Sequence, residues 1–135
     1  MTHLNRSPRI LVIDHHLFWR QLSTRALSGA GYVVEDCEDY RSALLQKDKS
    51  DLVILSCANV GDDEQRLITQ LLKERAHLLV LSSYLSRSVM RSLYLQGVDD
   101  ITDKPYDPVS LVTLVEQLLQ KIASNNTLQL IEEKV

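Results

Sequence analysis

The sequence lacks the features of membrane-spanning, secreted and nucleic-acid-binding proteins. No apolar run approaches the roughly 20 residues that a membrane-spanning helix needs. The formal net charge is −3, which gives no strong field to attract DNA or a membrane surface. Residues 1–9 are polar and contain no stretch like the apolar part of a secretory signal. We therefore expect a cytoplasmic protein with no nucleic-acid or membrane partner.

Cysteines and aromatic residues are also scarce. Cys37 and Cys57 are too few for a disulfide framework or a spaced zinc site, and we expect both to be buried thiols in a reducing compartment. Aromatic residues make up 5% of the chain, so aliphatic side chains must fill the core. The hydrophobic fraction of 44% and the length of 135 residues are typical of one globular domain.

Apolar runs alternate with helical patterns along the chain. The expected strands are residues 10–13, 33–34, 52–55, 78–81 and 98–101. The clearest of these runs are apolar throughout, as in strands that are buried on both faces, and residues with helical spacing follow each run. Five such units predict an α/β fold, a doubly wound parallel sheet with helices on both faces.

The last helix has a predicted start and a predicted end. Asp107 can cap its free amides, and Pro108 suits the first helical position. The polar residues 124–127 are expected to end this helix. We therefore expect one domain over residues 8–123, followed by a tail or the start of a linker over residues 124–135.

The crevice of an open parallel sheet lies outside the carboxyl ends of its strands, so these ends are where a site is expected. The residues at these ends combine acids, hydroxyls and a lysine: Asp14, His15, Ser56, Ser82, Ser83, Asp103 and Lys104.

Four segments, in this order, resemble the receiver domain of bacterial two-component response regulators. Residues 10–20 are similar to its first strand and pair of acids, and residues 51–56 to its third strand, which ends in the phosphoacceptor aspartate. Residues 79–83 match its fourth strand and switch hydroxyl, and residues 97–108 its fifth strand and Lys-Pro turn. The resemblance covers about residues 8–123. It implies a non-enzymatic signalling module with the flavodoxin-like (βα)5 fold and strand order 2-1-3-4-5.

The resemblance also implies roles for individual residues. In the family, two acids, the acceptor aspartate and a carbonyl just beyond it hold Mg²⁺, while a lysine and a hydroxyl bind the phosphate oxygens. Carried over residue by residue, Asp14 matches the first acid, Ser82 the switch hydroxyl and Lys104 the lysine.

Other positions depart from the family pattern. Ser56 stands in place of the phosphoacceptor aspartate, and His15 replaces the second acid. Asn59 and Val60 replace the usual Met-Pro pair, and Ile101 replaces the aromatic residue that turns inward on activation. A serine hydroxyl is a poor nucleophile near neutral pH without activation. With only one of the family's acids kept, the site also has too few hard oxygen ligands for Mg²⁺.

The favoured interpretation is therefore a pseudo-receiver that acts through phosphorylation-independent protein–protein interaction. It has no catalytic residue and no cofactor, and its Mg²⁺ binding is lost or weak. One alternative is a phosphorelay receiver that is phosphorylated at Asp14, Asp62 or Ser56. Another is a module that binds a small anion or metabolite through Lys104 and Ser82. Lys104 lacks its usual aspartate, and we hypothesise that it forms an ion pair with Asp14.

Two further functions find little support. His15 and His16 beside Asp14 lack a third ligand for a metal site, so no metal centre is expected. The strand-end serines, Ser56 among them, lack the glycine-flanked turn and the base of a hydrolase nucleophile.

The partner is expected to be a protein or an attached output domain. Many response regulators form dimers and bind partners through the surface of the fourth helix, fifth strand and last helix. The candidate residues on this surface are Arg87, Arg91, Tyr94, Asp99 and Asp100. A homodimer through this surface is one form that the interaction could take.

Overall fold

The computed structural model describes residues 6–46, 50–104 and 107–134. Its elements alternate between strand and helix throughout. They are β1 (Arg9–Asp14), α1 (Leu17–Gly29), β2 (Val33–Cys37), α2 (Tyr40–Gln46), β3 (Leu52–Asn59), α3 (Asp62–Lys73), β4 (Leu78–Tyr84), α4 (Arg87–Gln96), β5 (Asp100–Asp103) and α5 (Pro108–Lys134).

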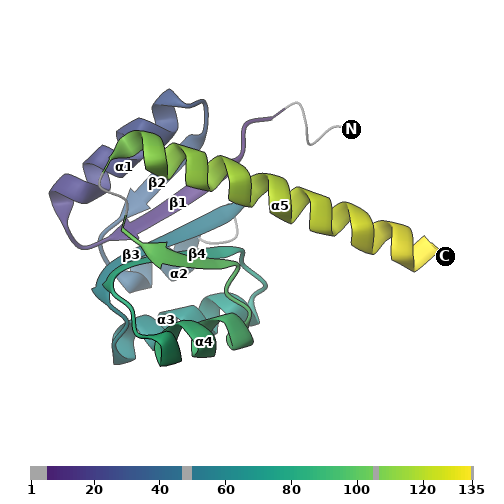
Figure 1. Ribbon diagram of the computed structural model, residues 1–135. Helices are drawn as coiled ribbons and strands as arrows, with labels where there is room; N and C mark the ends of the chain where they lie inside the picture. Colours follow the sequence, from purple (N-terminus) through teal and green to yellow (C-terminus); the bar gives the residue numbers. More distant parts are fainter. Residues whose placement is uncertain (1–5, 47–49, 105–106, 135) are drawn as a thin grey trace.

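The five strands form one parallel sheet in the order β2-β1-β3-β4-β5 (Figure 1). The predicted α/β class and strand order are therefore confirmed. Strand positions differ slightly from the predicted ones, because β3 continues to Asn59 and β5 begins only at Asp100. Val98, which was expected to start the last strand, is buried but lies before it.

Alternate residues of each central strand face opposite sides of the sheet. One core cluster joins residues such as Leu11 and Val53 to α2, α3 and α4, and the other joins residues such as Ile10 and Ile54 to α1 and α5. Figure 1 shows the sheet between these two layers, with α1 on one side of it and α3 and α4 on the other. The sheet is doubly wound, and aliphatic side chains fill both layers as the composition predicted.

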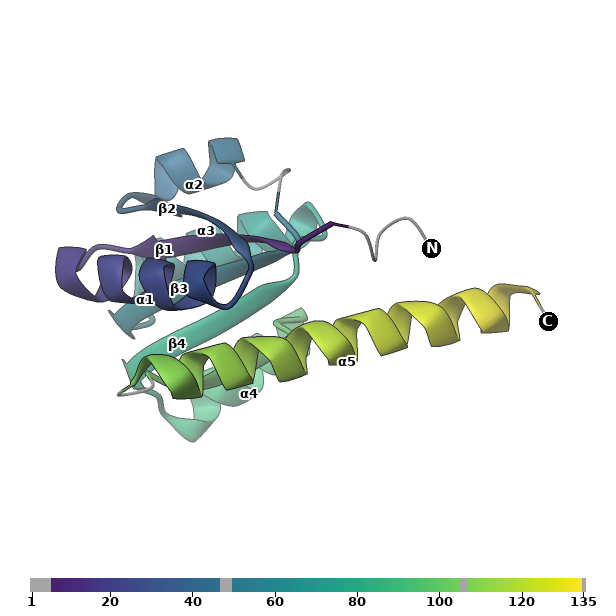
Figure 2. The same cartoon turned by 90° about the horizontal axis from the view of Figure 1, so that it is seen from above.

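The end of α5 differs from the prediction. The helix continues to Lys134, and its C-terminal part projects beyond the sheet in both views (Figures 1 and 2). Serine, asparagine and threonine at 124–127 are weak helix formers, but no glycine or proline follows them to stop the helix. The next residues, 128–134, are leucine, glutamine, isoleucine, glutamate and lysine, which mostly favour a helix. The start of α5 is as predicted, since Asp107 accepts hydrogen bonds from the Ser110 backbone amide and hydroxyl.

Candidate functional site

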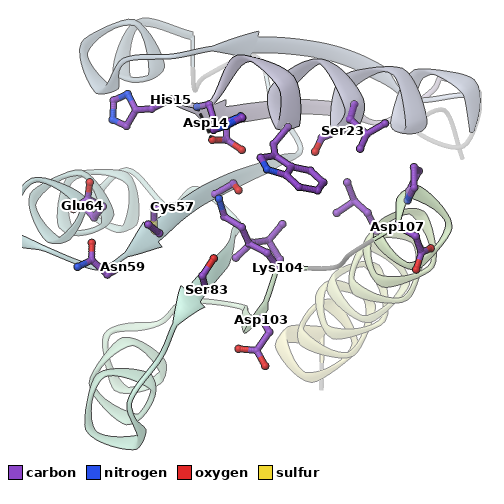
Figure 3. Close-up of a pocket in the computed structure, with 18 of the residues that line it drawn as sticks. Asp14, His15, Ser23, Cys57, Asn59, Glu64, Ser83, Asp103, Lys104 and Asp107 are labelled. Atoms are coloured by element: carbon purple, nitrogen blue, oxygen red, sulfur yellow. Dashed lines mark hydrogen bonds between the residues drawn. The ribbon is translucent and has the colours of Figure 1, made fainter.

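A cavity of about 610 Å³ lies at the carboxyl ends of the strands, where the site was expected (Figure 3). Six of the seven strand-end residues singled out from the sequence border it directly, and Ser82 is the exception. Its wall contains Asp14, His15, His16, Trp19, Leu22, Ser23, Tyr40, Ser56, Cys57, Ala58, Asn59, Glu64, Leu81, Ser83, Asp103, Lys104, Asp107, Pro108 and Leu111. The cavity thus lies over the sheet edge between the starts of α1 and α5.

Asp14 is buried at the end of β1, with only 3% of its surface exposed. Its Oδ1 accepts a hydrogen bond from the His16 backbone amide at 3.0 Å. Its Oδ2 is buried and has no hydrogen-bond partner among the residues that the structure describes. Ser56 is the register partner of Asp14 on β3, so the two residues lie beside each other on neighbouring strands. One carboxylate oxygen of this wall residue is therefore left unpaired.

Lys104 borders the same cavity but forms no ion pair with Asp14. The hypothesised ion pair between these two residues was therefore wrong. The ends of β1 and β5 are separated by β3 and β4, which places their backbones roughly 14 Å apart at the usual strand spacing. Contact across this distance would need both side chains to extend fully toward each other.

Ser82 lies behind the wall of the cavity and does not border it. Ser82 is completely buried, and its Oγ donates a hydrogen bond to the Ala58 carbonyl oxygen at 3.0 Å. Ser83, the next residue, borders the cavity instead. One alternative from the sequence was a ligand that Lys104 and Ser82 bind together. In this arrangement the Ser82 hydroxyl is already hydrogen-bonded and does not reach such a ligand.

Glu64 is a wall residue that the sequence interpretation missed. Its Oε1 accepts a hydrogen bond from the Gly61 backbone amide at 2.9 Å, and its Oε2 accepts one from the Tyr40 hydroxyl. Asp62, one of the alternative phosphorylation sites, lies on α3 outside the wall. The spacing of Gly61 and Glu64 is half of a capping box, and this pattern could have predicted the position of Glu64.

His15, Tyr40 and Glu64 form one cluster at a side of the cavity. The rings of His15 and Tyr40 lie 4.9 Å apart between centroids. Burial acts to raise the pKa of Glu64, but hydrogen bonds from Tyr40 and Gly61, with the nearby His15, hold that pKa below its ordinary value. Burial and the bond to Glu64 raise the pKa of Tyr40. The cluster therefore holds Glu64 as a carboxylate and Tyr40 as a phenol.

Cys57 borders the cavity beside this cluster (Figure 3). Burial and the charge of Glu64 raise the pKa of its thiol to about 11. Burial also raises the pKa of Cys37 to about 11. Both thiols are buried, as predicted, and both are neutral at physiological pH. Within the described part of the chain, no three His, Cys, Asp or Glu side chains are grouped to hold a metal ion.

Comparisons with known proteins agree with this fold. No family model matches the chain. The chain is 28% identical over 125 residues to the probable transcriptional regulator ycf27 of Galdieria sulphuraria, which covers 90% of this chain and 49% of that protein. The chain therefore spans about half the length of this curated relative.

Solved structures are similar over most of the chain. A CheY-like response regulator receiver domain protein from Methanospirillum hungatei has a TM-score of 0.78 at 19% identity, covering 88% of this chain and 98% of that one. NtrX from Brucella abortus has a TM-score of 0.83 at 22% identity, covering 96% of this chain and 31% of that one. The chain has the receiver fold.

The remaining positions that depart from the family pattern have clear places in this receiver fold. Ile101 on β5 is buried in the core cluster formed with α2, α3 and α4. Asn59 ends β3 and borders the cavity, while Val60 packs on the same core cluster. Ile101 thus contributes to packing and not to the surface.

The predicted partner surface on α4 and β5 is partly committed to internal bonds. Asp99 accepts a hydrogen bond from the Leu78 amide at 2.8 Å, and Tyr94 donates one from its hydroxyl to Asp100 at 3.0 Å. Arg87 and Arg91 are charged residues along α4. Asp99 therefore serves the fold, while the use of this surface by a partner stays a prediction.

Among the described helices, none has the length and apolar content to cross a membrane.

Proposed function

We propose that this chain is the receiver module of a response regulator. It signals through a protein partner or an attached output domain, and no side chain of its cavity is phosphorylated. The observation that carries the proposal is the pairing of Ser56 on β3 with Asp14 at the end of β1. In the family, the position of Ser56 belongs to the phosphoacceptor aspartate. A serine hydroxyl needs an activating base to act as a nucleophile, and among the described residues no hydrogen bond joins the Ser56 hydroxyl to the neighbouring Asp14 carboxylate.

The groups around Asp14 do not fit Mg²⁺. This ion needs near-octahedral oxygen ligation, usually with one or two carboxylates. Asp14 offers a single free oxygen, while both oxygens of Glu64 already accept hydrogen bonds. The Ala58 carbonyl, two residues beyond Ser56, accepts the Ser82 hydroxyl. Because these three oxygen donors offer so few free positions, we expect Mg²⁺ binding to be lost or weak.

The groups that respond to phosphate in the family support the same interpretation. The Ser82 hydroxyl already has a buried acceptor in the Ala58 carbonyl, and Ile101 is already packed in the core. Moving either group would break a buried hydrogen bond or expose apolar surface. An output that depends on partner contact requires neither movement.

An attached output domain is supported by the curated relative, which is about twice as long as the matched region. The continuation of α5 to Lys134 gives a helical connection toward any such domain. A homodimer through the surface of α4, β5 and α5 is the other form of contact that we propose. Tyr94 and Leu95 give this surface two exposed apolar side chains.

The proposal is tested by incubating the protein with acetyl phosphate and Mg²⁺ and measuring its intact mass. We expect no stoichiometric gain of a phosphoryl group. The matched control restores the two missing carboxylates with His15→Asp and Ser56→Asp in one variant. Because both side chains border the same cavity, we expect this variant to gain one phosphoryl group.

A stoichiometric mass gain in the unmodified chain would overturn the proposal in favour of phosphorylation at a non-standard residue. The variants Ser56→Ala, Asp14→Asn and Asp62→Asn would then identify the acceptor, since only one of them should abolish the gain.

A further inference from the structure

The unpaired Oδ2 of Asp14 is a buried acceptor that requires a partner. Buried polar atoms in folded proteins nearly always have a hydrogen-bond partner, and an unpaired one, above all a charged one, costs stability. Oδ1 of the same carboxylate is satisfied by the His16 amide, so the side chain is held in place. Its free oxygen is therefore a fixed, unpaired acceptor in a residue that borders the cavity.

The cavity is much larger than a single water site. Its volume of about 610 Å³ lies within the range of roughly 300–1,000 Å³ that is usual for small-molecule sites. Apolar side chains from three elements form much of its wall: Trp19, Leu22, Leu81 and Leu111. An apolar wall with few polar groups is the usual design of a site for a small molecule with an apolar body.

Two opposite charges face this space without pairing with each other. Asp14 lies at the end of β1 and Lys104 at the end of β5, and both border the cavity (Figure 3). The other acids at the wall are differently placed, because Glu64 is bonded on both oxygens and Asp107 caps α5. Asp103 is exposed, and its carboxylate points away from Asp14 in Figure 3.

We propose that the cavity binds a small zwitterionic molecule of the amino-acid class with an apolar side chain. Its ammonium group donates to Asp14 Oδ2, its carboxylate accepts from Lys104, and its side chain packs against Trp19 and Leu111. This arrangement satisfies the buried acceptor, gives the lysine an anionic partner and covers apolar surface. The inference goes beyond the proposed function and does not rest on it.

The test measures binding of three matched probes by two-dimensional NMR titration of the full chain. L-Phenylalanine carries both charges, phenethylamine lacks the carboxylate, and 3-phenylpropionate lacks the ammonium. We expect L-phenylalanine to bind the unmodified chain most tightly, with shifts concentrated at the cavity. Glycine, which has both charges and no side chain, should bind at least about tenfold more weakly because it covers no apolar wall.

Two variants separate the contributions of the charges. Asp14→Asn keeps the acceptor for the His16 amide. It should weaken the binding of L-phenylalanine and phenethylamine by about tenfold or more and leave the binding of 3-phenylpropionate unchanged. Lys104→Met should weaken the binding of L-phenylalanine and 3-phenylpropionate and leave the binding of phenethylamine unchanged. Lys121→Met, on an exposed turn of α5 outside the wall, is the matched control and should change none of the affinities.

Three results would overturn the proposal. One is the absence of cavity shifts with all three probes in a chain whose NMR spectrum shows it to be folded. Another is equal binding of L-phenylalanine by the unmodified chain and Asp14→Asn. The third is saturable binding of Mg²⁺ alone at Asp14 that displaces L-phenylalanine, which would assign the free oxygen to a cation.

Discussion

The hydroxyl of Tyr40, at the start of α2, donates a hydrogen bond to Oε2 of Glu64, in the first turn of α3. The other oxygen of Glu64 accepts the Gly61 amide at the beginning of the same helix. This pair therefore joins two helices across one side of the cavity. A hydrogen bond to a charged acceptor in a partly buried place contributes more than a neutral one at the surface.

Replacing Tyr40 with phenylalanine should lower the free energy of unfolding by about 1–2 kcal/mol. The substitution removes the hydroxyl and keeps the ring that contacts His15. Urea denaturation followed by circular dichroism measures the change. Tyr84→Phe is the matched control, because the Tyr84 side chain is 76% exposed at the end of β4, and this variant should be neutral. Equal stability of both variants would show that the bond to Glu64 contributes nothing.

The low pKa of Glu64 predicts how stability depends on pH. The pKa in the folded chain lies below the ordinary value of 4.5, so folding favours the carboxylate. The resulting stabilisation is fully present above pH 4.5 and disappears as the pH falls through the folded-state pKa. The measured quantity is the difference in unfolding free energy between the unmodified chain and Glu64→Gln.

This difference should be largest near pH 7 and should shrink below pH 4.5. Other acids with lowered pKa values, such as Asp51 and Asp107, occur in both proteins, so their contributions to the unfolding free energy cancel in the difference. A difference that stays constant down to pH 3 would contradict the prediction.

The raised pKa of Cys57 predicts a thiol that reacts slowly despite its place at the cavity wall. With a pKa of about 11, roughly 1 thiol in 1,000 is ionised at pH 8, and the thiolate is the form that reacts. In a Cys37→Ser background, iodoacetamide should modify native Cys57 at least about 100-fold more slowly than the chain unfolded in urea. Mass spectrometry over time measures both rates.

The Glu64 charge is one cause of this raised pKa, so Glu64→Gln should speed native labelling of Cys57. Labelling of the native protein at the rate of the unfolded chain would contradict both the burial and the pKa of this thiol.

The sheet and the place of the cavity could be predicted from the sequence because they follow from simple patterns. Uninterrupted apolar runs such as residues 52–55 mark strands that are buried on both faces, and parallel strands bring their carboxyl ends to one edge. Asp14, Ser56 and Lys104 therefore had to gather at one place. Sequence spacing alone was sufficient for this because it depends on the backbone.

The directions of individual side chains could not be predicted in the same way. Ser82 and Ser83 are adjacent and chemically identical, yet only the second borders the cavity, because successive residues of a strand point to opposite faces. The Lys104–Asp14 pair failed because β3 and β4 separate the ends of β1 and β5, and Glu64 was missed because its spacing from Gly61 was overlooked. The predicted end of α5 was wrong because the residues at 124–127 are weak helix formers, and weak helix formers do not by themselves end a helix.

The domain boundary at residue 123 gives the last prediction. Of the α5 side chains that the structure describes, Leu111, Val115, Leu118 and Ile122 are buried, and residues 124–126 are exposed. A chain that ends after residue 123 keeps all of these core contacts, so its unfolding free energy should differ by less than about 1 kcal/mol from that of the full chain. Leu118→Ala in the full chain should instead cost about 2–5 kcal/mol, because it leaves a cavity between α5 and the sheet. Urea denaturation of the three proteins makes the comparison, and a truncated chain as unstable as Leu118→Ala would place the end of the domain beyond residue 123.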